Sequence, residues 1–245
     1  MLFFRKNTPT LSDLIPSDYV DIHSHLLPGI DDGAKDINDS KNLLESVKKI
    51  GFSECIATPH IFSGVWENTP ETITTALEKT KTTLNEPSLK AAAEYMMDSN
   101  FYDNLKKEHP LLTLKENYVL VEMSYMNAPI QLYDIIFEIQ LQGYKPILAH
   151  PERYLFYGTN WNEFQKLKKV GCLFQLNLLS ATGYYGIGVT KIAQKILDSN
   201  WYDFVGSDIH HEKHVAAFGN KIQLKNFSSL ESIIKNNRFF SSPIF

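Results

Sequence analysis

Histidine and carboxylate side chains recur at the ends of short apolar segments in this 245-residue chain. Five of the eight histidines share that position with two glutamates and one aspartate: His23, His25, His60, Glu94, Glu122, His150, Asp208 and His210. Unpaired charges are costly to bury, and bound divalent cations remove that cost. Mixed nitrogen and oxygen ligands suit Mn, Fe or Zn. The pattern therefore predicts a site for several metal ions.

The spacing of the first two histidines supports a shared ion. His23 and His25 are two residues apart on an expected strand, so both side chains point to the same face. Asp32 follows a few residues later and can fold back over them. Taken singly, His60 or Glu122 is more often a hydrogen-bonded or solvated structural residue. The joint pattern, and not any one residue, indicates metal binding.

The candidate ligands need elements that bring strand ends together. Strands are expected over 19–25, 54–60, 89–95, 118–124, 145–150, 172–179 and 202–207. Helices are expected over 36–50, 70–86, 100–107, 130–142, 160–170, 189–199 and 228–236. This alternation implies a parallel sheet, either doubly wound or closed into a barrel. Barrel enzymes place their chemistry at the carboxyl ends of strands, which favours the barrel.

Composition excludes several classes of protein. Apolar residues make up 43% and charged residues 21%, as in ordinary globular domains. The net charge of −4, with no basic stripe, argues against nucleic-acid binding. No apolar run approaches the roughly 20 residues of a transmembrane helix, and none resembles a secretory signal. We expect a cytoplasmic protein with one domain over 19–245 and an N-terminal arm over 1–18 outside the core.

The two cysteines are poor candidates for catalysis. Cys55 and Cys172 lie in apolar segments and are expected to be buried free thiols. A cysteine-dependent phosphatase needs Arg six positions after the nucleophile, and those positions hold Ile61 and Leu178. Hydrolysis by a cysteine nucleophile is therefore not expected.

The run DIHSHLLPGIDDGA at 21–34 resembles the opening motif of the bacterial PHP-type protein-tyrosine phosphatases. PHP denotes the polymerase and histidinol phosphatase superfamily. The resemblance continues in ATPH at 57–60, HPERY at 150–154, SATGYYG at 180–186 and GSDIH at 206–210. It covers nearly all of the chain from residue 19. His-x-His alone is shared with many amidohydrolase-like enzymes, whereas LPGIDDG together with HPER is specific.

The resemblance implies a distorted (β/α)7 TIM-like barrel, the PHP fold, that hydrolyses phosphotyrosine on proteins. It implies a role in capsule or exopolysaccharide synthesis, with a bacterial tyrosine kinase of that system as the partner. It also implies three divalent ions, with Mn expected. The ligand sets carried over are His23, His25, Glu94 and Asp208; Glu94, Glu122 and His150; and Asp32, His60 and His210.

Arg153 matches the phosphate-binding arginine of that family. In the implied mechanism a metal-activated hydroxide attacks phosphorus while the planar guanidinium binds two phosphate oxygens. The alternative is an ordinary ion pair of Arg153 with Glu152 or another carboxylate. The general acid for the leaving group stays open, with His210 and His211 nearby in sequence.

Four aromatic residues, Phe62, Trp66, Tyr184 and Tyr185, follow the second and sixth expected strands. They could form a rim around a phosphotyrosine ring, or simply pack the loops onto the core. Two other functions also stay open. One is a small-molecule phosphatase such as histidinol phosphatase, and the other is a non-catalytic, metal-stabilised regulatory module.

Overall fold

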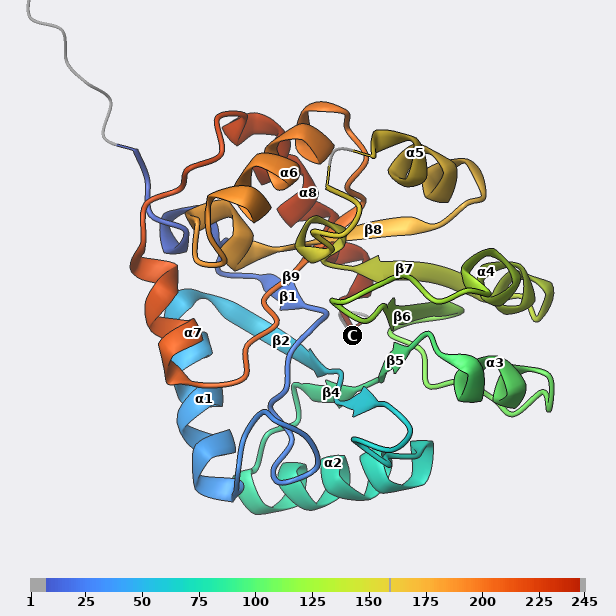
Figure 1. Ribbon diagram of the computed structural model, residues 1–245. Helices are drawn as coiled ribbons and strands as arrows, with labels where there is room; N and C mark the ends of the chain where they lie inside the picture. The colour runs from blue at the N-terminus through green and yellow to red at the C-terminus, as the bar shows by residue number, and fades with distance from the viewer. Residues whose placement is uncertain (1–7, 159, 243–245) are drawn as a thin grey trace, which may run out of the picture.

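Parallel strands with helices on their outer side make up the molecule, as the computed structural model shows for residues 8–158 and 160–242 (Figure 1). The strands are β1 Tyr19–Asp21, β2 Phe52–Ala57, β3 His60–Ile61, β4 Leu89–Ala91, β5 Glu94–Met96, β6 Tyr118–Glu122, β7 Lys145–Ala149, β8 Leu173–Asn177 and β9 Phe204–Gly206. The α-helices are α1 Ile37–Ile50, α2 Pro70–Leu84, α3 Ser99–Leu105, α4 Leu132–Leu141, α5 Trp161–Lys169, α6 Ile187–Asp198, α7 Glu212–Ala216 and α8 Phe227–Asn236. Short 3-10 helices include Ser12–Leu14, Pro151–Arg153, Leu178–Thr182 and Asn237–Phe240.

The strands form two parallel sheets. One has the order β1-β2-β4 and the other β3-β5-β6-β7-β8-β9. The sheets adjoin, because the Ala92 N–H donates to the Ala57 carbonyl at 2.8 Å and the Glu94 N–H to the Pro59 carbonyl at 3.1 Å. The expected α/β class with parallel strands is confirmed. Among the described residues, however, the ladders do not make one closed barrel.

The described residues form nine strands instead of the seven expected, because two of the expected strands are interrupted. Pro59 has no N–H to donate to a ladder and separates β2 from β3. Ala92 and Ala93, which have low strand propensity, separate β4 from β5. Each interrupted strand keeps its direction, so its second half reaches the same end of the sheet as its neighbours.

The helices begin and end where local signals place them. The Asp36 carboxylate accepts the N–H groups of Asn38 and Asp39 at the start of α1, and Gly51 ends that helix at a φ of 123°. All seven expected helices are present with boundaries that differ by a few residues. The short α7 was not expected, because five residues are too few to display a helical period.

The segment before β1 corrects the expectation of an arm outside the core. Leu11 and Ile15 are buried in the hydrophobic core, and the Leu11 N–H donates to the Asn220 carbonyl at 3.0 Å. Residues 1–7 lie outside the described part of the chain. Cys55 and Cys172 are buried free thiols, as expected. None of the described helices is long and apolar enough to cross a membrane.

Candidate metal centre

The nine predicted metal ligands lie together on one face, which we call the mouth. Seven of them lie at or beyond the carboxyl ends of strands, and His60 and Glu94 begin the short strands β3 and β5. Glu94, at the start of β5, is fully buried in the middle of the cluster. Its Oε2 atom lies 3.2 Å from His23 Nε2 and 3.1 Å from His60 Nδ1. Its Oε1 atom lies 3.2 Å from His150 Nε2. His25 Nε2 is also within reach, at 3.5 Å from Oε2, so one carboxylate contacts four imidazoles.

Two further carboxylates extend the cluster. Asp208 Oδ1, beyond β9, lies 3.3 Å from His23 Nε2 and 3.4 Å from His25 Nε2. Glu122 Oε1, at the end of β6, lies 2.8 Å from His60 Nδ1. Both carboxylates are buried. These contacts connect the ends of β1, β3, β6 and β9.

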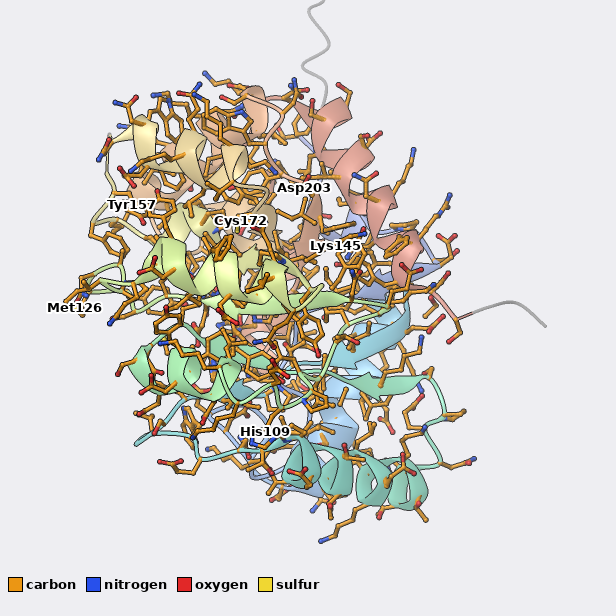
Figure 2. The ribbon with its side chains drawn as sticks, turned by 90° about the vertical axis from the view of Figure 1, so that its right-hand side faces the viewer. His109, Met126, Lys145, Tyr157, Cys172 and Asp203 are labelled. Atoms are coloured by element: carbon orange, nitrogen blue, oxygen red, sulfur yellow. The ribbon has the colours of Figure 1, made fainter. Side chains whose placement is uncertain are left out.

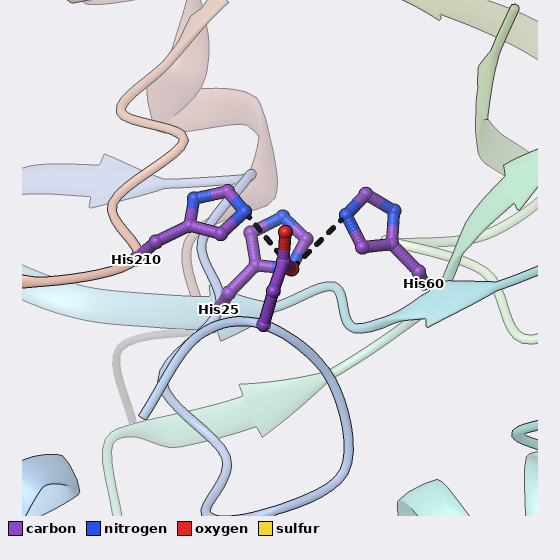
Figure 3. A group of neighbouring side chains, drawn as sticks. His25, His60 and His210 are labelled. Atoms are coloured by element: carbon purple, nitrogen blue, oxygen red, sulfur yellow. Dashed lines mark ion pairs between the residues drawn. The ribbon is translucent and has the colours of Figure 1, made fainter. Parts of the chain in front are cut away.

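The outermost group surrounds Asp32. Its Oδ1 atom lies 3.4 Å from both His60 Nε2 and His210 Nε2. Figure 3 shows His25, His60 and His210 facing one another, with the two ion pairs dashed. Gly33 allows this loop to approach the strand, because a Cβ there would lie 2.1 Å from the His25 carbonyl oxygen. Glycine at position 33 therefore allows the Asp-Asp-Gly loop to pack directly against the His25 backbone.

The ligand atoms form four overlapping groups that could each hold an ion: His23, Glu94 and His150; His23, His25 and Asp208; His60, Glu94 and Glu122; and His25, Asp32, His60 and His210. Both Glu94 oxygens, His60 Nδ1 and His150 Nδ1 are buried without a hydrogen-bond partner. Buried polar atoms are normally satisfied. Divalent cations would satisfy the Glu94 oxygens, so the residues present fit a polynuclear metal site.

Two ring-orienting residues were missed by the sequence analysis. The Nδ1 atom of His25 lies 2.7 Å from Asp31 Oδ2, and that of His23 lies 2.9 Å from Gln175 Oε1. Such partners fix the ring so that its other nitrogen would face an ion bound in the cluster. The two consecutive aspartates at 31 and 32 could have indicated the role of Asp31. Nothing in the sequence distinguishes Gln175 from other polar strand residues.

Two of the candidate ligands have left-handed backbone conformations. His150 has a φ of 36° and Asp208 a φ of 53°. Residues other than glycine rarely adopt such angles, and those that do cluster at functional sites. Here the sharp turns directly after β7 and β9 place these two side chains in the cluster. The strain is consistent with a site whose geometry is held by the surrounding fold.

The side chains of the cluster differ in the direction in which their pKa values are shifted. Burial lowers the pKa of His150 to about 4, with help from the positive charge of Arg153. At neutral pH this imidazole is neutral, the form that binds metals. Burial and the charge of Glu94 raise the pKa of Glu122 to about 7. Burial alone would raise the pKa of Glu94, but His23 and His60 hold it well below its usual range.

Arg153 lies beside the cluster in the 3-10 helix after β7. Its Nη1 donates to Asp208 Oδ2 at 2.6 Å. The guanidinium carbon lies 4.6 Å from the ring centre of Tyr125 and 4.1 Å from that of Tyr185. Arg153 thus forms an ion pair with another carboxylate, Asp208, which was part of the alternative, and not with Glu152. The buried Glu152 carboxylate accepts the Ser180 and Tyr202 hydroxyls at 2.7 and 2.9 Å.

The four aromatic residues predicted to form a rim lie in two different parts of the structure. Tyr185 contacts Arg153, and Tyr184 packs edge-on against Tyr185 at 5.0 Å between ring centres. Phe62 and Trp66 instead pair with each other across a turn after β3. Tyr125, on the other side of Arg153, was missed, because it lies in a loop with no charged or histidine residue to attract notice.

The other histidines near the mouth have structural partners. His214 Nδ1 accepts the His210 N–H at 3.2 Å, and His211 Nδ1 accepts the His214 N–H at 3.3 Å. These bonds fix the turn that carries His210 and begin α7. They give the two histidines a role in holding the loop, and neither belongs to the groups that could hold an ion.

Comparison with known proteins identifies the relatives of this arrangement. A family model described as capsular polysaccharide synthesis, CpsB/CapC, matches residues 19–218. The tyrosine-protein phosphatase YwqE of Bacillus subtilis is 27% identical over 91% of this chain and 94% of its own length. The tyrosine-protein phosphatase CpsB of Streptococcus pneumoniae is 29% identical over 78% of this chain and 83% of its own.

A solved structure agrees with the sequence matches. It comes from crystallographic work on YwqE and CpsB, which are described there as unique metal-dependent tyrosine phosphatases. The alignment has a TM-score of 0.73 and 28% identity, and it covers 91% of this chain and 88% of the other. The similarity thus extends over the whole fold that carries the candidate metal centre.

Proposed function

The chain belongs to the CpsB/CapC family of capsular polysaccharide synthesis, and on this basis we propose that it is a metal-dependent tyrosine-protein phosphatase. The composition of one site in the chain itself carries the proposal. Nine histidine and carboxylate side chains meet at the mouth, the central carboxylate has no hydrogen-bond partner, and an arginine lies at the edge of the cluster. The proposed reaction is the hydrolysis of a phosphate monoester.

Three divalent ions, with Mn expected, would occupy the centre. We assign His23, His25, Glu94 and Asp208 to the first ion, Glu94, Glu122 and His150 to the second, and Asp32, His60 and His210 to the third. The group of His23, His25 and Asp208 supports the first set, and the group of His25, Asp32, His60 and His210 supports the third. For the second set the support is that Glu94 lies in one group with His150 and in another with Glu122. Divalent ions bound there would activate water for attack on phosphorus and neutralise charge on the phosphate oxygens.

Arg153 would bind the phosphoryl group of the substrate. Stacking between Tyr125 and Tyr185 restricts the guanidinium plane, and the Asp208 contact sets its direction. Asn177 Nδ2 donates to the same Asp208 oxygen at 2.9 Å, so the carboxylate is held from two sides. An arginine fixed in this way can meet two phosphate oxygens with little loss of side-chain entropy.

We also propose that the two sheets together are a distorted seven-stranded barrel. If β2 with β3 and β4 with β5 each count as one interrupted strand, seven strands remain. A parallel bridge between Ser24 and Ile209, with the His25 N–H donating to the Ile209 carbonyl at 2.9 Å, joins the extensions of β1 and β9. These contacts support closure at the level of the metal ligands.

The proposed substrate is a phosphotyrosine protein, and the proposed partner is a bacterial tyrosine kinase of the polysaccharide system. The family description and the names of the relatives support a role in capsule synthesis. We place the activity in the cytoplasm, where the free thiols of Cys55 and Cys172 would remain reduced.

A substrate screen tests the proposal. Protein reconstituted with Mn²⁺ is assayed against phosphotyrosine peptide, phosphoserine peptide and histidinol phosphate. We expect preferential hydrolysis of phosphotyrosine peptide that stops on chelation. Preference for histidinol phosphate would instead identify a small-molecule phosphatase. Binding of phosphotyrosine peptide without turnover would identify a regulatory module.

A further inference from the structure

Three loops at the mouth contain no charged residue. They are the loop after β6 (residues 123–131), the part of the loop after β7 that lies beyond His150, Glu152 and Arg153 (residues 154–158 and 160), and the loop after β8 with the first turn of α6 (residues 178–190). We call them the uncharged rim. None of their positions holds Lys, Arg, Asp, Glu or His, although such residues are common in surface loops. This composition sets one side of the mouth apart from the rest.

Large apolar side chains of the uncharged rim are exposed. Met126 is 82% exposed, Ile130 98% and Ile187, at the first residue of α6, 65%. Leu155, Tyr125 and Tyr184 are also exposed. Figure 2 shows Met126 projecting at one edge of the molecule. An exposed cluster of such residues is typical of an interaction site.

The rim is continuous with the proposed phosphate site. Tyr125 and Tyr185 belong to its first and third loops and enclose Arg153 between them. Leu155 lies beside the start of α6, since a Cβ on Gly188 would be 3.8 Å from its Cδ2 atom. A chain whose phosphotyrosine reaches Arg153 can therefore place its neighbouring residues against these loops.

We propose that the uncharged rim is the docking surface for the substrate residues that flank the phosphotyrosine, and that it selects uncharged, apolar flanking side chains. This inference rests on the proposed phosphatase activity. Apolar side chains of the substrate would remove exposed apolar surface from water, which favours binding. That surface belongs to Met126, Ile130, Leu155 and Ile187. A flanking Asp, Glu, Lys or Arg would lose water there and find no oppositely charged partner among the three loops.

The test compares two phosphotyrosine peptides of equal length with free phosphotyrosine. One peptide has apolar, uncharged residues on both sides of the phosphotyrosine, and the other has acidic residues there. We expect wild-type kcat/KM to be at least about tenfold higher for the apolar peptide, which corresponds to about 1.4 kcal/mol. Free phosphotyrosine, which has no flanking residues, reports the chemistry alone.

A combined Ile130→Ser, Leu155→Ser, Ile187→Ser variant should lose most of that preference. Its kcat/KM for the apolar peptide should fall about tenfold or more, because truncation of central interface residues has effects of this size. Its kcat/KM for free phosphotyrosine should stay within about twofold of wild type. The matched control is Phe137→Ser, Leu141→Ser, which removes two residues of α4 that are 63% and 66% exposed outside the rim.

Each outcome decides the question. Equal hydrolysis of both peptides by the wild type, or unchanged preference in the rim variant, would overturn the docking surface while leaving the phosphatase activity intact. A dimer that the rim variant abolishes, with unchanged peptide kinetics, would assign the rim to self-association instead. Failure of the wild type to hydrolyse even free phosphotyrosine with Mn²⁺ present would refute the proposed function itself.

Discussion

The two sides of the mouth differ in charge. Two aromatic residues of the uncharged rim, Tyr125 and Tyr185, lie against Arg153, whereas the loops after β1 and β9 carry residues of both charges. A hollow of about 400 Å³ on the second side is lined by Asp32, Lys35, Asp39, His210, Glu212 and Lys213, among others. We call these loops the charged side. Five of the candidate metal ligands follow β1 or β9, namely His23, His25, Asp32, Asp208 and His210. Of these, only Asp32 and His210 are at least partly exposed to solvent.

This difference points to a division of tasks. The hollow on the charged side is lined by Asp32 and His210, so water can reach the outer part of the candidate metal centre. On the uncharged rim Arg153 is enclosed by two aromatic rings, and its interaction with a phosphate is less screened by solvent. We infer that one side serves the metals and water and the other the substrate. Four predictions test this division, from the largest expected effect to the smallest.

Removal of the central carboxylate should have the largest effect. Glu94→Gln should lower bound Mn²⁺ and reduce kcat/KM about a thousandfold or more, because metals supply several kcal/mol of transition-state stabilisation. Chelation of the wild type should do the same and be reversed by Mn²⁺. Glu212→Gln, a carboxylate of the charged side outside the cluster, is the control and should remain close to wild type. Full turnover by metal-free protein would contradict the assignment.

Loss of the arginine should separate substrate binding from metal binding. Arg153→Ala should lower kcat/KM on a phosphotyrosine peptide roughly ten- to a hundredfold, since a charged hydrogen bond is worth about 1.5–3 kcal/mol. Arg153→Lys should recover part of this, because it keeps the charge and loses the planar fork. Metal content and Tm should stay near wild type in both. A variant that lost metal together with activity would show that Arg153 acts through Asp208, its present partner.

The sequence predicted the members of this site better than their arrangement. Ligand residues could be found because they follow apolar strands whose carboxyl ends must meet in a parallel α/β fold. Which nitrogen meets which oxygen depends on turns such as those at His150 and Asp208, whose left-handed backbone has no sequence signal. His60, for example, lies close enough to Glu94, Glu122 and Asp32 to belong to two groups.

The fold was predictable in class and less so in detail. Alternating segments predicted the order of strands and helices. The breaks at Pro59 and at Ala92 have local causes, the missing N–H of proline and the low strand propensity of alanine, which the expected strand ranges did not take into account. The burial of Leu11 and Ile15 was missed because their partners in the core are distant in sequence. Gln175 and Tyr125 were missed for the same reason: their roles arise from contacts with His23 and Arg153, which only the folded chain creates.

A smaller effect is expected from the ring-orienting aspartate. Asp31→Asn should weaken Mn²⁺ binding by roughly ten- to a hundredfold, because it loses the charged partner that orients His25. At saturating Mn²⁺ its kcat should approach that of the wild type. Asp39→Asn, in the first turn of α1, is the matched control and should bind Mn²⁺ normally. Calorimetric titration of metal-stripped protein measures both. Equal Mn²⁺ affinity in the two variants would remove Asp31 from the metal centre.

The smallest effect is expected from the cysteines, which lie on neither side of the mouth. Burial raises the pKa of Cys172 to about 12 and that of Cys55 well above its usual range, so both are neutral thiols at physiological pH. A neutral thiol is a poor nucleophile. The Cys55→Ala, Cys172→Ala variant should therefore keep kcat/KM within about twofold of wild type for each equivalent of bound Mn²⁺. Its Tm should fall by a few degrees, because lost sulfur contacts leave small cavities in the core.

Kinetics, metal analysis and thermal unfolding of the same preparation separate these effects. A large loss of kcat with normal metal content and folding would show that a thiol takes part in the reaction, and the mouth would then not contain all of the chemistry.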